Sequence, residues 1–150
     1  MTMQRLNLII ISLVGVAGLF TAVLATSILS AYQSIPNVGT VKSVGVGVYK
    51  NLECNESVTL INWGILGPGD KANFIIYVRN EGNILLKLNI TTSNWNPENA
   101  SRYIAFEWNP VGRILNPSEV VPVTLTLSVS PDIEGVTSFQ FEIFVVGIEV

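Results

Sequence analysis

Residues 6–25 form a long apolar run that carries no charge. Its three polar residues, Asn7, Ser12 and Thr21, do not gather on one helical face, which argues against a buried helix of a soluble protein. Twenty helical residues measure about 30 Å, the thickness of a bilayer's hydrocarbon core. We therefore predict an N-terminal helix within residues 1–34, which contacts the lipid bilayer through residues 6–25.

The charges beside this run predict its orientation. Arg5 and the amino terminus precede it, and the next charged residue is Lys42. Because basic flanks stay in the cytoplasm, everything after about residue 33 is expected outside. Two alternatives stay open for the helix itself. It is a retained anchor, since the run is longer than most signals need, or a cleaved signal, since small residues such as Ala25 suit a cleavage site.

After residue 36 the pattern changes to alternation of apolar and polar positions, as in residues 123–130, where Val and Leu alternate with Thr and Ser. Asn80–Asn83 joins two apolar runs, so residues 73–92 are predicted as a β-hairpin. Further strands are expected at residues 41–49, 58–63, 103–108 and 139–145. About seven short strands predict that residues 35–150 are all-β, one antiparallel immunoglobulin-like β-sandwich.

The first of these strands has a nearly flat face. From Val38 to Tyr49, glycines 39, 45 and 47 share one side of the alternation. A strand of this kind specifies its register weakly and can pair with its own sandwich or with a neighbour's edge. We expect it to pair within its own chain.

Composition removes several classes of function. The chain has no histidine, which excludes imidazole bases and ligands, and its one cysteine, Cys54, permits neither an intrachain disulfide nor a thiolate cluster. Cys54 is expected to be a part-buried structural thiol, with an intermolecular bridge or a modified thiol as the alternative. The net charge is −3 and the eight Lys and Arg are scattered, so nucleic acid is not an expected partner.

Catalytic groups are equally scarce. Glu53 with Glu56, or Asp132 with Glu134, are the carboxylate pairs in the sequence, but paired-carboxylate catalysis needs a deep cleft that a short-looped sandwich lacks. We interpret these carboxylates as solvated surface. The sequence therefore predicts no enzyme activity, no cofactor or metal site, and no small-molecule substrate.

Three N-x-[ST] triplets begin at Asn55, Asn89 and Asn99, all on the side expected to be exported. Asn89 falls on the outward face of its predicted strand. We predict that at least one carries an N-glycan, with plain polar surface as the alternative. The tryptophans at 63, 95 and 108 suit a carbohydrate-stacking platform or core packing, and core packing is favoured because Trp108 is in phase with the core.

Several short segments of the chain form a recognisable pattern: Ile61-Asn62-Trp63-Gly64, Gly67–Lys71, Ile76–Asn83, Trp95-Asn96-Pro97, Leu115-Asn116-Pro117 and Phe139–Gly147. With these segments, residues 46–147 resemble archaeal cell-surface proteins that consist of a single immunoglobulin-like domain and are related to TasA-like fibre subunits and archaeal bundling pili. The resemblance implies a secreted or membrane-tethered structural role, sometimes in fibres where one subunit lends a strand to the next, and it brings no catalytic residues. Arg5-Leu6 departs from the basic-then-small pair that precedes the helix of archaeal pilins.

We expect a membrane-anchored or secreted extracellular module of the cell surface, structural or interacting, whose partners are other envelope proteins or copies of itself. The alternative is a subunit of an extracellular fibre or pilus, assembled by strand donation or by bundling of the N-terminal helices.

Overall fold

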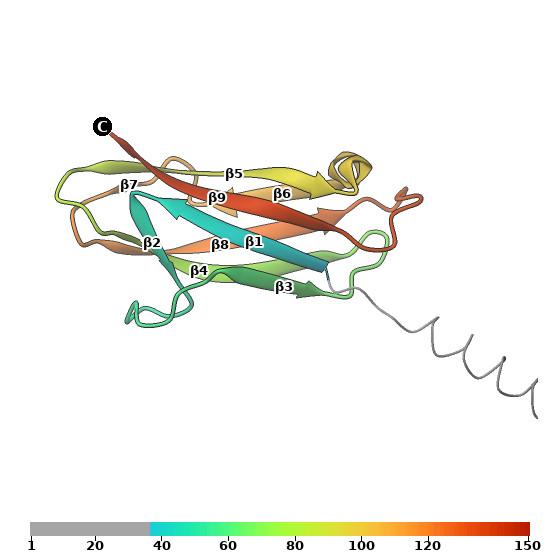
Figure 1. Ribbon diagram of the computed structural model, residues 1–150, viewed down its shortest axis with the longest axis horizontal. Coiled ribbons are helices and arrows are strands. Elements are labelled where there is room, and N and C mark those ends of the chain that lie inside the picture. Colours follow the sequence, from blue (N-terminus) through green and yellow to red (C-terminus); the bar gives the residue numbers. More distant parts are fainter. Residues whose placement is uncertain (1–36) are drawn as a thin grey trace, which may run out of the picture. The chain divides into compact units, whose positions relative to one another are not determined.

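The computed structural model describes residues 37–150, which form two β-sheets packed face to face (Figure 1). No helix in that range is long and apolar enough to cross a membrane. The helix expected within residues 1–34, and its bilayer contact through residues 6–25, lie outside the described residues. The strands are β1 (Asn37–Val44), β2 (Val46–Tyr49), β3 (Leu60–Gly64), β4 (Lys71–Asn80), β5 (Leu86–Asn96), β6 (Ile104–Asn109), β7 (Ile114–Leu115), β8 (Val120–Val129) and β9 (Gln140–Glu149), with one 3-10 helix, η1 (Glu98–Arg102).

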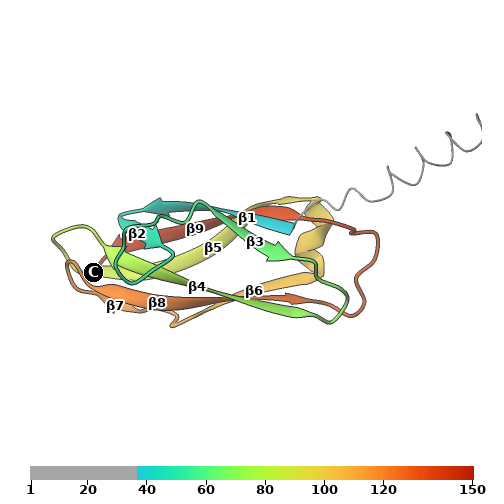
Figure 2. The ribbon, with the colours of Figure 1, turned by 90° about the horizontal axis from the view of Figure 1, so that it is seen from below.

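The five-stranded sheet has the order β3-β1-β9-β5-β7, and the four-stranded sheet has the order β2-β4-β8-β6. Figure 2 shows the two layers from the side. The all-β, immunoglobulin-like sandwich expected from the sequence is confirmed. It is not purely antiparallel, because β1 runs parallel to β9, with Val38 opposite Gln140 and Val44 opposite Val146.

The interior is built from every second residue of the long strands, as the alternation predicted. Leu125 and Leu127 of β8 are fully buried, and Ile143 and Val145 of β9 face them from the other sheet. Each such side chain contributes about 1.5–3 kcal/mol when it leaves water. The neighbouring Thr126 is half-buried on the outer face, where its hydroxyl donates to Asn73 Oδ1 at 2.8 Å.

Aromatic rings fill one end of the core. Trp95 stacks on Phe141 with ring centroids 4.2 Å apart, and Trp63 lies 6.4 Å from the same ring on another side. Trp108 is half-buried and packs against the core. The tryptophans therefore serve packing, as favoured from the sequence, and they do not form an open stacking platform.

The predicted hairpin over residues 73–92 is wrong. β4 lies in the four-stranded sheet beside β2 and β8, whereas β5 lies in the five-stranded sheet beside β9 and β7. Alternation tells which face of a strand is buried but not which strand is its neighbour. Both strands do bury one face, and the chain crosses between the layers at residues 81–85.

The single strand predicted over residues 38–49 is also wrong. Gly45 has a φ of +75°, a left-handed conformation that ends β1 and sends β2 into the other sheet. The buried phase changes there, since Val41 faces inward in β1, while Val46 and Val48 do so in β2. This break and the two-residue β7 raise the number of strands from about seven to nine. In this structure β1 pairs with β3 and β9 of its own chain, and β2 pairs with β4.

Candidate functional site

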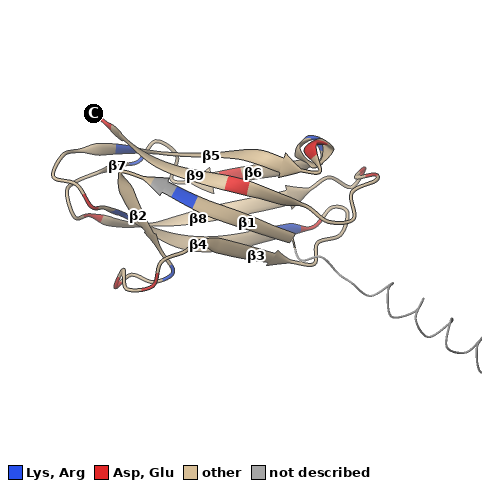
Figure 3. Cartoon of the chain, viewed as in Figure 1, with Lys and Arg blue, Asp and Glu red and all other residues tan. Residues whose placement is uncertain are grey.

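Charged side chains are few and spread over the sandwich (Figure 3). Three exposed ion pairs form between Lys42 and Glu142 (2.6 Å), Arg113 and Glu119 (2.7 Å), and Lys50 and Glu56. Of the four carboxylates considered for catalysis, Glu56 is thus engaged by a lysine. Within residues 37–150 no three His, Cys, Asp or Glu side chains gather where they could hold a metal ion.

Two carboxylates have a pKa below the ordinary value of 4.5 because of structural contacts. The pKa of Glu119 is lowered by hydrogen bonds from the backbone N–H of Asn116 at 2.7 Å and from its side-chain amide, and then by Arg113. The pKa of Glu142 is lowered by Lys42 and by Asn94, whose amide donates at 2.6 Å. Glu119 joins the turn before β8 to Arg113, and Glu142 joins β9 to Lys42 of β1 and to Asn94 of β5.

The three triplet asparagines lie on separate elements, and all are exposed. Asn55 is in the loop between β2 and β3, where its Oδ1 accepts from Asn51 Nδ2 at 2.5 Å. Asn99 is in η1, where the hydroxyl of Ser101 donates to Glu98 O at 2.8 Å. Asn89 stands on the outward face of β5, as its phase indicated. Glycosylation of these residues stays a prediction.

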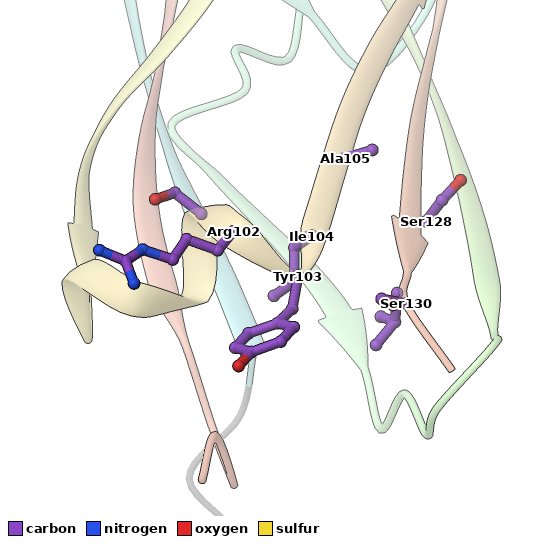
Figure 4. A pocket seen from close by; sticks show the side chains of 8 residues that line it. Arg102, Tyr103, Ile104, Ala105, Ser128 and Ser130 are labelled. Carbon is purple, nitrogen blue, oxygen red and sulfur yellow. The ribbon is translucent and has the colours of Figure 1, made fainter. Parts of the chain in front are cut away.

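A shallow hollow lies beside η1, between the start of β6 and the end of β8. Figure 4 shows that Arg102 and Tyr103 project from one side of it, while Ser128 and Ser130 stand on the other. The side chains of Arg102 and Ser128 do not converge on a common point. The lining mixes polar side chains with Ile104, Ala105 and Val129, and it brings no set of polar groups together around one ligand position.

The more unusual surface is the outer face of the five-stranded sheet near β7. Val44 lies opposite Val146, and Ile148 and Ile114 flank Lys87 on either side. Val44, Ile148 and Ile114 are 61%, 50% and 47% exposed. We call this surface the apolar outer face; its residues are Val44, Ile114, Phe144, Val146 and Ile148.

Asn89 stands in the middle of the apolar outer face. It is directly opposite Val146, and Thr91, which completes its triplet, is directly opposite Phe144. Residues i and i+2 of a strand share one face, so both parts of the triplet point to the same side as these apolar residues. Lys42 borders the surface with its Nζ 5.5 Å from the centre of the Phe144 ring.

The sequence predicted the outward position of Asn89 but not the apolar residues that surround it. The last strand carries apolar residues at both phases from Phe144 onward, including Val146 and Ile148. Doubly apolar strands are typical of strands buried on both sides, and β9 is buried on one side only. Apolar residues at both phases of this last strand were therefore the sequence feature that indicated an apolar outer face.

No family model and no curated protein matches the chain. Among solved structures, the chain is similar to the ASH/PapD-like domain of human CEP192 (PapD-like domain 7), with 14% identity and a TM-score of 0.38. The match covers 71% of this chain and 87% of that one. A likeness of this size says nothing about function, and the sandwich architecture rests on the strand topology described above.

Proposed function

We propose that the chain is a non-catalytic module of the cell surface, membrane-anchored or secreted, whose sandwich stands outside the membrane. One observation carries the proposal. Residues 6–25 have no charge and are long enough to span a bilayer, and they are followed, from Asn37 onward, by a sandwich with its own hydrophobic core. The scattered surface charges and the core packed with aromatic side chains support a structural or interacting role. Other envelope proteins or copies of the chain are the proposed partners.

A second candidate is a subunit of an extracellular fibre or pilus, assembled by strand donation or by bundling of the N-terminal helices. The place of β1 favours donation. It is the first strand of the sandwich, yet it lies inside the five-stranded sheet between β3 and β9. The first strand of a neighbouring copy would find hydrogen-bonding partners on both sides in the same position.

The location is tested with a site for a sequence-specific protease inserted after Glu53, in the exposed loop that follows β2. Exposed loop tips tolerate insertions, whereas the folded strands resist a general protease. In intact cells of the native host, or in right-side-out vesicles, we expect cleavage by added protease without lysis. Cleavage that requires lysis would place the sandwich inside and refute the proposal.

The two candidates are separated by the size of the full-length protein in mild detergent, measured by light scattering. An anchored module gives one discrete species, and a fibre subunit gives a ladder of oligomers. Val41→Lys places a charge at a buried position of β1, the strand that would be donated. If strand exchange builds the ladder, this substitution should abolish it.

A further inference from the structure

The apolar outer face is open to water only in part: Val44, Ile114 and Ile148 are exposed, whereas Phe144 and Val146 of the central strand β9 are half-buried. Val44 and Val146 stand side by side on β1 and β9, with Phe144 next to them. Isolated apolar residues are normal on a surface, but a contiguous group of this kind marks a place that another molecule covers. The position of Asn89 indicates which kind of molecule that is.

We propose that an N-linked sugar chain at Asn89 covers the apolar outer face, with its first sugar packed on Phe144 and Val146. The inference rests on the proposed function, because glycosylation requires export. Asn89 is opposite Val146 and diagonal to Phe144, and diagonal neighbours on a sheet face are within reach of large groups. A sugar attached here has these side chains directly beneath it.

The chemistry of a sugar ring suits this surface. One side of the ring carries C–H groups that pack on aromatic and branched side chains, while its hydroxyls need hydrogen-bond partners. Phe144 and Val146 provide the apolar support, and Thr91, Lys87 and Lys42 stand around them as polar neighbours. Apolar side chains that the sugar covers leave water, which is favourable.

The other two triplets lack this support. Asn55 is in a loop and its amide is engaged by Asn51. Asn99 borders a hollow lined by Glu98, Ser101 and Arg102. A sugar at either position extends from polar surface, so only the sugar at Asn89 should stabilise the sandwich. A sugar at Asn89 also blocks flat packing of a second protein on the apolar outer face.

The test uses the full chain produced in a secretory host that attaches N-glycans, purified in mild detergent and trimmed enzymatically to the first sugar. Mass spectrometry of peptides gives the occupancy of each site. Thermal melting followed by tryptophan fluorescence then compares the unsubstituted chain with Asn89→Gln, Asn55→Gln and Asn99→Gln. We expect the loss of the sugar at Asn89 to lower the Tm by about 4 °C, the shift that about 1 kcal/mol gives in a domain of this size. Loss at Asn55 or Asn99 should change the Tm by about 1 °C or less.

A matched pair of substitutions separates the sugar from the side chain. Thr91→Ser keeps the triplet and should keep the sugar and the higher Tm, whereas Thr91→Ala removes both. Phe144→Thr should abolish the difference between the glycosylated and unglycosylated proteins, because the supporting ring is gone. Val146→Thr, a smaller change on the same face, serves this purpose if Phe144→Thr does not fold.

Three results would overturn the proposal: a chain without sugar at Asn89, equal stabilisation from all three sites, or a stabilisation that survives both Phe144→Thr and Val146→Thr. The host imposes export, so these results judge the covered face alone. The protease-site experiment in the native host judges the location separately.

Discussion

At the scale of single residues, Asn80 holds the corner at which the chain crosses from one sheet to the other. It is fully buried at the end of β4. Its side-chain amide donates to Ile84 O at 2.7 Å and to Leu115 O at 3.1 Å, and its Oδ1 accepts from Gly82 N at 2.9 Å. One side chain therefore fixes the turn before β5 and fastens it to β7.

We predict that Asn80→Ala lowers the free energy of unfolding by about 3 kcal/mol, because the buried Leu115 carbonyl loses its partner, the turn loses two further hydrogen bonds and a void remains. Asn83→Ala is the matched control, since Asn83 is exposed in the same turn, and it should change stability by less than about 0.5 kcal/mol. Urea unfolding measures both. Equal effects would show that the amide does not hold the corner.

Glu119 is a residue whose charge matters for the turn before β8. Its pKa is lower in the folded protein than its ordinary 4.5, so the folded state favours the ionised form. The resulting stability is present above about pH 4.5 and is lost as the pH falls through the lowered pKa. We predict that Glu119→Gln reduces the loss of stability between neutral and acidic pH. Melting temperatures across that range check this, and an unchanged pH profile would contradict the assigned contacts.

At the scale of elements, the sequence predicted which side of a strand is buried better than it predicted neighbours. The buried phases of β8 and β9 followed from alternation, because burial of one face imposes a period of two. The neighbours of β4 and β5 did not follow, because the corner depends on contacts of Asn80 with the distant Leu115. The break between β1 and β2 at Gly45 could not be predicted either, because a glycine permits a left-handed turn without requiring one.

The candidate site was predictable only in part, because alternation gives the face on which a residue lies but not its neighbours on other strands. The outward position of Asn89 followed from the phase of its strand. Its neighbours Phe144 and Val146 come from a strand more than fifty residues away, and only the register of β5 on β9 brings them beside it. A local pattern contains no information on that register.

The faces of β8 give a direct test at this scale. Leu125→Asp should destabilise the sandwich by roughly 3 kcal/mol or more, because it places a charge in the core and removes apolar contacts. Thr126→Lys should cost less than about 1 kcal/mol, since it loses only the outer-face hydrogen bond to Asn73. Thermal melts of the two variants measure this. Similar losses would contradict the assigned faces.

At the scale of the whole molecule, an apolar segment, residues 6–25, precedes a sandwich whose first strand begins at Asn37. We propose that this sandwich lies outside the membrane. Cys54 provides a single site for chemical labelling of the sandwich, because it is the chain's one cysteine and is partly exposed in the loop after β2.

The most direct test is the reaction of intact cells of the native host with a maleimide that does not cross membranes. We predict that Cys54 is labelled to the same extent before and after lysis. For the anchored form, the control is Thr2→Cys in a Cys54→Ser background, which should react only after lysis because it precedes the apolar run. Ser57→Cys, at an exposed position of the same loop, replaces Cys54 if the native thiol reacts slowly. Labelling of the loop that appears only after lysis would place the sandwich in the cytoplasm and contradict its proposed location outside the membrane.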